Sequence, residues 1–330
     1  MTTPAKLPTG SHRSRQHAAP DWSLGRRQLF AATAVGLTAW LARPLQSLAD
    51  DVADSSSDNG PLPYVDRIGL QLYTVRDQMK ADAEGTIQAI AKAGYRQVEL
   101  MSIDDDAIKI AAIARDHGLM VHSAFMDFGG ITHPDRDGVI SVDRTVEIAE
   151  RIGLRHVVFG YIARDERDSV EKCQTIAENA NRAAEKTRAA GMRMGYHNHS
   201  FEFAKLDGGA KTAFDIFIER FDPQLMDFEL DVFWVKIGGE DPIAMMKKLA
   251  GRITQVHLKD LKADVGTIND EGQVPADAFQ ELGDGVIDMP AIMRLAKEIG
   301  VRECHVEQDQ SPAPIDSINQ SIQFLNQKRS

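Results

Sequence analysis

From Arg67 onward, short apolar segments alternate with longer amphipathic segments, and this alternation constrains the fold more than any other feature of the chain. Such a pattern predicts strands that are connected by helices and therefore form a parallel sheet. Eight segments have the length and composition of strands: 68–75, 96–101, 120–125, 156–161, 193–199, 226–233, 253–259 and 302–307. Helical segments lie between them, for example at 165–190 and 289–299. Eight strand–helix units in about 265 residues predict an α/β protein with a (β/α)8 TIM barrel fold.

The main alternative is a doubly wound open sheet, which normally carries a glycine-rich dinucleotide-binding turn after its first strand. Here the first predicted strand instead runs into Tyr73-Thr74-Val75-Arg76. The chain also contains no GxGxxG, Walker A or GxSxG motif. Because these motifs accompany dinucleotide binding, phosphate binding and serine-hydrolase chemistry, the sequence favours the barrel and argues against these three functions.

The charge of the chain is distributed unevenly along its length. The 330 residues carry 38 Lys and Arg against 49 Asp and Glu, a net charge of −11. Residues 1–49 contain six basic side chains and one acidic side chain, so the remainder holds 32 basic against 48 acidic side chains. An acidic surface repels phosphate backbones, and we therefore expect no binding to nucleic acid. Two cysteines, Cys173 and Cys304, are too few for a disulfide framework.

The basic N-terminal part has the features of an export signal. Arg26 and Arg27 precede an uncharged segment, residues 29–42, whose 14 residues are fewer than the ~20 of a membrane-spanning helix. The small-residue sequence Ser47-Leu48-Ala49 follows. We expect residues 1–49 to be a twin-arginine signal peptide that engages the twin-arginine translocase, leaving a periplasmic or exported protein without a membrane span. An uncleaved anchor and an ordinary secretory signal are the alternatives.

A polar segment separates this signal from the predicted barrel. Residues 50–64 are rich in Ser, Asp, Gly and Pro and show no hydrophobic periodicity, which predicts a linker. The barrel domain is then expected to cover residues 65–330.

Polar side chains gather late in the predicted strands, and within each strand they share one parity. They are Gln71 and Tyr73; Gln97 and Glu99; His122; His197 and His199; Glu229 and Asp231; His257 and Lys259; and His305 and Glu307. Residues two apart in a strand point to the same side, and the carboxyl ends of barrel strands carry the active site. Carboxylates and imidazoles that are buried there without partners would cost much free energy. We expect one divalent metal ion (Mn, Co, Zn, Fe or Mg) to balance them, the alternative being a hydrogen-bonded polar layer without an ion.

Four segments carry a resemblance to a known family: residues 195–202 (GYHNHSFE), 229–234 (ELDVFW), 256–260 (VHLKD) and 306–309 (VEQD). They resemble the xylose-isomerase-like TIM barrels, the sugar phosphate isomerase/epimerase superfamily, over roughly residues 65–328. The resemblance implies a sugar substrate and one divalent metal held by acidic and histidine side chains on the fifth to eighth strands. It does not select a reaction, because members include ketose epimerases, inosose dehydratases, 3-keto-glycoside lyases and endonuclease IV.

The resemblance also implies particular metal ligands. Asp231, His257 and Glu307 match three ligands of the family, whereas His197 stands where the family commonly has a ligating Glu. His197 is therefore the expected fourth ligand, and Glu202 is the alternative. Trp234 stands where several members have a substrate-binding His.

The remaining polar residues are candidates for catalysis and substrate binding. Glu202 and Glu307 are candidate catalytic bases, with His199 as a further one, and Lys259 is expected to stabilise an enolate or to bind a substrate oxygen. Glu99, His122, His199 and Trp234 are expected to bind substrate. Structural roles are the alternatives, such as an ion pair of Lys259 with Asp260 or Glu307.

These residues predict chemistry at a carbon next to a carbonyl group. A metal bound to two neighbouring oxygens of a hydroxy-ketone stabilises the enediolate that forms when a base removes the adjacent C–H proton. The sequence therefore predicts a metal-dependent sugar isomerase or epimerase with a small-molecule sugar as its partner. A 3-keto-glycoside β-eliminating lyase and a non-catalytic periplasmic sugar-binding protein are the alternatives.

Replacing both Arg26 and Arg27 with Lys should stop export, because the arginine pair identifies a twin-arginine signal. Immunoblots of periplasmic and cytoplasmic fractions would measure this, with an Arg13→Lys, Arg15→Lys variant as the control. Periplasmic protein at the wild-type level would show that the arginine pair is not the signal.

Overall fold

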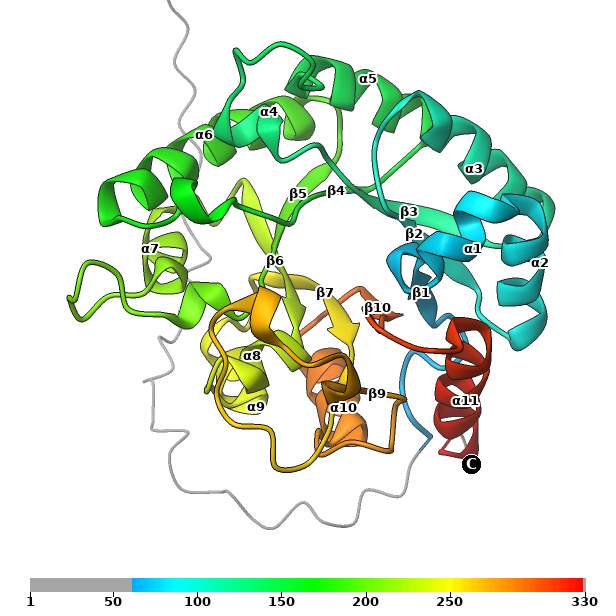
Figure 1. The fold of residues 1–330 in the computed structure, drawn as a ribbon. Helices are drawn as coiled ribbons and strands as arrows, with labels where there is room; N and C mark the ends of the chain where they lie inside the picture. Colours follow the sequence, from blue (N-terminus) through cyan, green and yellow to red (C-terminus); the bar gives the residue numbers. More distant parts are fainter. Residues whose placement is uncertain (1–60, 329–330) are drawn as a thin grey trace, which may run out of the picture. The chain divides into compact units, whose positions relative to one another are not determined.

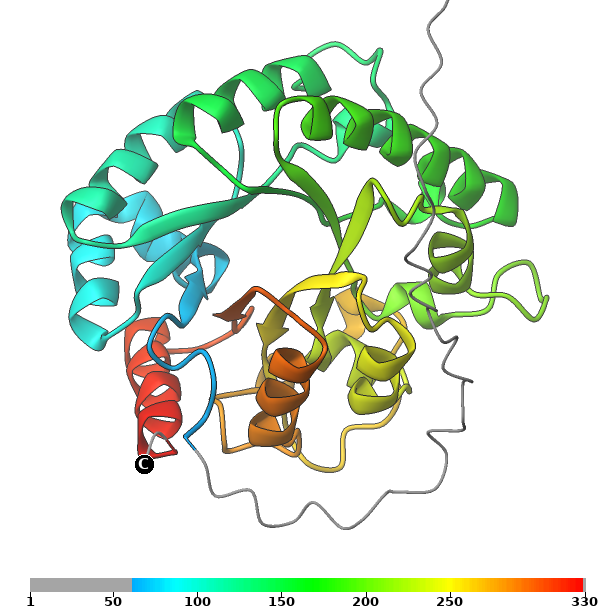
Figure 2. The same cartoon turned by 180° about the vertical axis from the view of Figure 1, so that it is seen from behind.

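The computed structural model describes residues 61–328, and the predicted signal peptide lies outside the described residues. Eight parallel strands close into a barrel in the order β1-β10-β7-β6-β5-β4-β3-β2, with the helices around its outside (Figure 1). Figure 2 shows the same barrel from behind, with the C-terminal helix α11 beside the first strand–helix unit. The predicted (β/α)8 TIM barrel is therefore confirmed. A separate antiparallel pair, β8 and β9, lies in the long connection between β7 and β10.

Each barrel strand lies within a segment that the sequence predicted as a strand. The barrel strands are β1 (Gly69–Gln71), β2 (Gln97–Leu100), β3 (Met120–Phe125), β4 (His156–Phe159), β5 (Arg193–His197), β6 (Met226–Asp231), β7 (Ile253–Leu258) and β10 (Glu303–Val306), and the additional pair is β8 (Asp260–Leu261) and β9 (Phe279–Gln280).

The α-helices connect these strands and cover the barrel. They are α1 (Arg76–Ala81), α2 (Ala83–Ala93), α3 (Asp105–Asp116), α4 (Gly129–Thr132), α5 (Val142–Ile152), α6 (Val170–Ala189), α7 (Ala213–Arg220), α8 (Val232–Ile237), α9 (Pro242–Lys248), α10 (Met289–Glu298) and α11 (Pro314–Gln327). Short 3₁₀ turns are η1 (Leu72–Val75), η2 (Arg164–Glu166), η3 (Phe201–Phe203), η4 (Glu271–Gln273) and η5 (Ala276–Ala278). Across residues 61–328, no helix combines the length and the apolar character that crossing a bilayer requires.

Capping side chains explain where several helices begin. In α5, the Ser141 side chain accepts a hydrogen bond from Arg144 N, and the helix ends at Gly153 with a φ of 76°, a left-handed conformation that favours glycine. Ile148, Ala149 and Ile152 of α5 are buried, so the apolar stripe of this helix packs toward the barrel.

Several strands end earlier than the sequence pattern predicted, and in β1 and β6 the polar residue at the strand end caps the helical turn that follows. Gln71 Oε1 accepts a hydrogen bond from Tyr73 N at 3.0 Å and begins η1. Asp231 Oδ1 accepts a hydrogen bond from Trp234 N at 3.0 Å and begins α8. Tyr73 and Trp234 therefore lie on helical turns at the barrel mouth and not in strands.

The first described residues already pack against the barrel. Tyr64 Oη donates a hydrogen bond to Val301 O at 2.7 Å, and Leu62 N donates one to Lys328 O at 3.3 Å. Both Leu62 and Tyr64 are buried. The last residues of the segment predicted as a linker thus belong to the packed domain.

One carboxylate organises the connection that follows β7. Asp260 Oδ1 accepts hydrogen bonds from Leu261 N (2.9 Å) and Ile287 N (3.0 Å), and Oδ2 accepts them from Gly283 N (2.9 Å) and Gly285 N (3.2 Å). A Cβ atom on Gly285 would lie 2.2 Å from Asp260 Oδ1, so this close approach requires glycine. Asp260 therefore closes the turn that holds β8, β9 and the start of α10 together.

Asp260→Asn should lower the free energy of unfolding by about 2–3 kcal/mol, because an amide has one acceptor oxygen and leaves buried backbone N–H groups unpaired. Urea denaturation followed by circular dichroism would measure the change. Asp277→Asn is the matched control, since Asp277 is exposed and pairs only with Lys262 at the surface; it should change the free energy by less than about 0.5 kcal/mol. Equal stability of wild type and Asp260→Asn would contradict this role.

Candidate active site

A cavity of about 650 Å³ opens at the carboxyl ends of the barrel strands. It is lined by Gln71, Tyr73, Met101, Phe125, Met126, Phe128, Gly160, Tyr161, His197, His199, Trp234, Lys259, Glu271, Gly272, Val274, Phe279, Glu307, Asp309 and Gln310. Five residues predicted for the site therefore reach this cavity: His197, His199, Trp234, Lys259 and Glu307. The volume is in the range of small-molecule sites.

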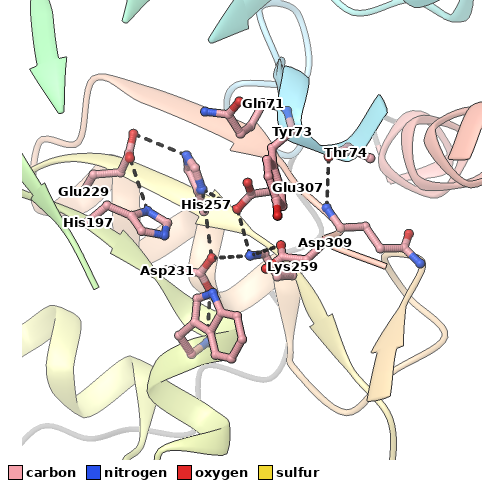
Figure 3. Close-up of polar contacts among 12 residues, drawn as sticks. Gln71, Tyr73, Thr74, His197, Glu229, Asp231, His257, Lys259, Glu307 and Asp309 are labelled. Carbon is pink, nitrogen blue, oxygen red and sulfur yellow. Dashed lines mark hydrogen bonds and ion pairs between the residues drawn. The ribbon is translucent and has the colours of Figure 1, made fainter. Parts of the chain in front are cut away.

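The structure brings the four predicted metal ligands together at one wall of this cavity. One side-chain atom from each of His197, Asp231, His257 and Glu307 lies within 4.8 Å of the others (Figure 3). Parallel pairing of β6 with β7 places Asp231 opposite His257, and pairing of β7 with β10 brings Glu307 beside them. The strand register therefore builds this group from residues that are far apart in the sequence.

The donor atoms of this group fit a divalent cation. Two imidazoles and two carboxylates suit Mn²⁺, Fe²⁺, Co²⁺ or Zn²⁺, and no thiolate is needed. Asp231 Oδ2 is buried and forms no hydrogen bond within residues 61–328, and the one Lys ammonium near it, Lys259 Nζ at 3.0 Å, is shared with Glu307 and Asp309. A buried carboxylate oxygen without a hydrogen bond is costly unless a cation balances it.

Lys259 supplies one buried positive charge to the same group. Its Nζ lies 3.0 Å from Asp231 Oδ2, 2.8 Å from Glu307 Oε2 and 2.5 Å from Asp309 Oδ1 (Figure 3). Burial alone would lower the pKa of Lys259, but the negative charges of Asp231, Asp309 and Glu307 raise it well above its usual value. Lys259 is therefore an ammonium ion that faces the cavity. Of its two predicted ion pairs, the one with Glu307 is formed, whereas Asp260 is used in the neighbouring turn.

Glu307 is held in its ionised form at the edge of the cavity. Its Oε2 also lies 2.9 Å from His257 Nδ1. Burial would raise the pKa of Glu307, but the positive charge of Lys259 and the contact with His257 lower it well below its usual value. An ionised carboxylate can serve as a ligand or accept a proton.

His199 and Trp234 form an aromatic wall with polar edges. Their ring centroids are 5.2 Å apart, and His199 stacks on Phe201 with 5.4 Å between centroids. Burial, followed by the positive charge of Lys259, lowers the pKa of His199 to about 3, so its imidazole is neutral. His199 Nδ1 and Trp234 Nε1 are buried and have no hydrogen-bond partner among residues 61–328. These two nitrogens are available to a polar ligand in the cavity.

Besides Asp231, two of the predicted carboxylates do not line the cavity. The carboxylate of Glu202 accepts hydrogen bonds from Tyr196 Oη at 2.6 Å and His199 N at 2.9 Å and is fully buried, so it holds the turn after β5. Glu99 lies inside the barrel, where its Oε2 accepts a hydrogen bond from Gln71 Nε2 at 2.9 Å and lies 2.7 Å from His257 Nε2. The structure thus gives Glu202 and Glu99 supporting positions and no direct access to a ligand.

His122 lies at the opposite end of the barrel from the candidate site. It stands near the amino end of β3 and lines a separate cavity with Arg115, Met120 and Arg155. The sequence prediction placed His122 at the mouth because the polar parity within a strand does not show at which end a residue lies. The structure does not bring His122 to the substrate cavity.

Two cavity residues were not assigned a role from the sequence. Asp309 contacts Lys259, and its parity with Glu307 would have indicated this position. Glu271 accepts hydrogen bonds from Tyr161 Oη at 3.0 Å and from Arg167 at 2.8 Å to each oxygen, and so fixes the β7–β10 connection to the loop after β4. No local sequence pattern marks Glu271, because its position depends on the path of a long loop.

Comparison with known proteins agrees with this geometry. The model of the xylose isomerase-like TIM barrel family matches residues 87–328. The chain belongs to the xylose isomerase-like TIM barrel family. A sugar phosphate isomerase/epimerase structure from Parabacteroides distasonis has the same fold, with a TM-score of 0.63 and 22% identity over 84% of this chain and 96% of that one.

Curated relatives of this family member are named inosose dehydratase. The protein from Clostridium beijerinckii is 28% identical over 271 residues, which cover 74% of this chain and 89% of the relative. The protein from Clostridium tetani is 29% identical over 161 residues, 46% of this chain, and here the chain spans about half (52%) of the relative's length.

Glu202 provides a pH-dependent test of the turn that carries His199. Burial raises the pKa of Glu202 to about 7 from 4.5, although its hydrogen bonds with Tyr196 and His199 lower it. A carboxyl group whose pKa is higher in the folded state than in the unfolded state adds to the free energy of unfolding. This contribution is fully present below pH 4.5 and is lost as the pH rises through 7. The destabilisation caused by Glu202→Gln should therefore shrink by roughly 2 kcal/mol between pH 5 and pH 8.

Urea unfolding at both pH values would measure this change, with the exposed Glu185→Gln as the control variant. A pH-independent difference between wild type and Glu202→Gln would show that this carboxyl titrates normally.

Proposed function

We propose that this protein is a metal-dependent enzyme that removes the proton next to the carbonyl group of a keto-sugar or cyclic polyol ketone and then eliminates a β-hydroxyl or β-alkoxy group. One observation carries the proposal. Glu307 is an ionised carboxylate at the cavity edge, placed between the Lys259 ammonium and His257. This arrangement provides one base beside one cation, which is what proton removal with enolate stabilisation requires.

Four residues would hold the metal: His197, Asp231, His257 and Glu307. When bound, a divalent ion would polarise the substrate carbonyl and stabilise the enediolate. His197, which stands where the family commonly has a Glu, fits this role, because an imidazole on β5 still supplies a ligand.

The chain's own groups account for the remaining steps. Lys259 and His257 both contact Glu307 Oε2, which leaves Oε1 to take the C–H proton. The Lys259 ammonium can donate a hydrogen bond to the developing enolate oxygen. The proton on Glu307 can then pass to the leaving oxygen, so that the substrate loses water or an alcohol. His199 and Trp234 offer nitrogen atoms that can bind the hydroxyl groups of the substrate.

Elimination is favoured over epimerisation by two separate bases for a structural reason. Epimerisation that uses separate bases needs a second free carboxylate on the other face of the sugar. The other carboxylates that line the cavity are already engaged, Asp309 by Lys259 and Glu271 by Arg167 and Tyr161. The similarity to proteins named inosose dehydratase supports the same choice.

Isomerisation or epimerisation, which the sequence favoured, is the second candidate. Its support is the 2.8 Å contact between Glu307 and Lys259, since a single base can return the proton to the neighbouring carbon of the enediolate. If the protein is instead a non-catalytic sugar-binding protein, it should bind the sugar without exchanging any of its C–H protons.

We further propose that the protein works in the periplasm or outside the cell, as the arginine pair predicts. A keto-sugar available there would be an unphosphorylated one. The export experiment with the Arg26 and Arg27 variant tests this part separately.

Asp231→Asn should abolish metal binding, because it removes a charged ligand while keeping the Oδ1 acceptor that caps α8. Elemental analysis of the purified protein should find one divalent ion per wild-type chain, none in Asp231→Asn, and one in the exposed control Asp106→Asn. Equal metal content in Asp231→Asn and wild type would disprove the ligand assignment.

Proton NMR in D₂O with inososes, 3-keto-glycosides and ketoses distinguishes the reactions. Loss of water or release of the aglycone supports elimination. Recovery of a deuterated isomer supports isomerisation or epimerisation instead. Binding of metal and sugar without any exchange would overturn both enzymatic candidates.

A further inference from the structure

Beneath the four proposed ligands, a carboxylate inside the barrel contacts both ligand histidines. Glu229 lies on β6, two residues before Asp231, and is fully buried. Its Oε2 lies 3.2 Å from His197 Nδ1, and its Oε1 lies 3.3 Å from His257 Nε2 (Figure 3). Glu229 thus bridges two imidazoles that come from different strands.

We propose that Glu229 is a positioning residue that fixes the orientation and the tautomer of both histidines for metal binding. This inference rests on the proposed metal site and adds a specific determinant of its affinity. A neutral imidazole has one N–H and one lone pair. If Nδ1 of His197 donates to Glu229, Nε2 carries the lone pair that binds the metal. If Nε2 of His257 donates to the buried carboxylates, of which Glu99 Oε2 lies 2.7 Å and Glu229 Oε1 3.3 Å away, Nδ1 is the ligand atom.

The contacts of His257 agree with this assignment. Its Nδ1 faces the proposed ligand group, 2.9 Å from Glu307 Oε2 and 3.9 Å from Asp231 Oδ2. Its Nε2 faces the barrel interior, toward Glu229 and Glu99. The ring therefore already presents one nitrogen to the ligands and the other to the buried carboxylates.

Glu229 is itself held in place from below. Gln255 Nε2 donates a hydrogen bond to Glu229 Oε1 at 2.8 Å. Glu229 Oε2 and His197 Nδ1 lie 3.2 Å apart, and neither atom forms a hydrogen bond within residues 61–328, so no other group in this part of the chain competes for either of them. A carboxylate that accepts a hydrogen bond from the non-ligating nitrogen of a histidine orients that ring and makes it a stronger ligand.

Glu229 differs from the neighbouring carboxylate Glu99 in one respect. Glu99 contacts His257 but not His197, whereas Glu229 contacts both. Within residues 61–328, the ion-pair contacts of Glu229 are with the two imidazoles, His197 and His257.

A second metal ion is the competing explanation for this buried group. One atom from each of Glu99, Glu229, His257 and His305 lies within 4.8 Å of the others. In that case Glu229 would be a ligand and not a positioning residue. The stoichiometry of the bound metal separates the two explanations.

The test is the Co²⁺ and Zn²⁺ affinity of the full-length protein and its Glu229→Gln variant, measured by competition with a chromophoric chelator. We expect about one metal per chain in both proteins, with 10–100-fold weaker binding in Glu229→Gln. The d–d absorption bands of bound Co²⁺ should also shift, because the two imidazoles change orientation.

Glu303→Gln is the matched control, since Glu303 is also a buried glutamate in the barrel but contacts Gln97 and neither ligand histidine. It should leave affinity and spectrum unchanged. Glu229→Asp keeps the charge, and its affinity should fall between those of wild type and Glu229→Gln. If Glu229→Gln fails to fold, Glu229→Asp decides the question.

Three results would overturn the inference. Wild-type affinity and spectrum in Glu229→Gln or Glu229→Asp would show that the contacts do not position the histidines. Two metals per wild-type chain, with one lost in Glu229→Gln, would make Glu229 a ligand. Absence of metal from the wild-type protein would refute the proposed metal site itself.

Discussion

The site depends on the electrostatic cost of burying carboxylates inside a closed barrel. Glu99, Glu229, Asp231 and Glu307 all lie at or below the mouth with little or no exposure, and removing such charges from water costs several kcal/mol each unless they are compensated. Lys259 is the one ammonium among them, and it reaches Asp231 and Glu307 but not the deeper pair. The imidazole of His257 connects both levels. A divalent ion held by the upper level would complete the charge balance, and the fixed strand register keeps the ligands in place for it.

The loops around this group are held by carboxylates that are engaged in hydrogen bonds to neighbouring segments. Glu202 closes the turn after β5 and supports His199, and Asp260 closes the turn after β8. Glu271 ties the long β7–β10 connection to Arg167, whose guanidinium lies 3.3 Å from the centroid of the Phe201 ring. Rigid support of this kind keeps catalytic groups within the small tolerances that proton transfer requires. The acidic composition of the chain therefore serves the architecture of the mouth as well as its chemistry.

Much of the fold and the centre of the site could be predicted from the sequence. The strand–helix alternation gave the barrel, and residues two apart, such as Glu229 and Asp231, were correctly placed on the same side. The alternation of side chains along a strand does not show how far from the barrel mouth a residue lies. His122 lies at the amino end of β3, and Glu99 lies below the ligands, because strand ends depend on capping and on register. Glu271 belongs to a long loop whose path is set by tertiary contacts with Arg167 and Tyr161, so no local signal marked it.

The central claim is that His197, Asp231, His257 and Glu307 bind one divalent ion. The most direct measurement is X-ray diffraction from crystals of the Co²⁺- or Zn²⁺-loaded protein, with data collected on both sides of the absorption edge of the metal. The account predicts one anomalous peak per chain, bonded to His197 Nε2, His257 Nδ1 and oxygens of Asp231 and Glu307. A peak bonded to another set of residues, or no peak from a protein soaked in excess metal, would contradict it.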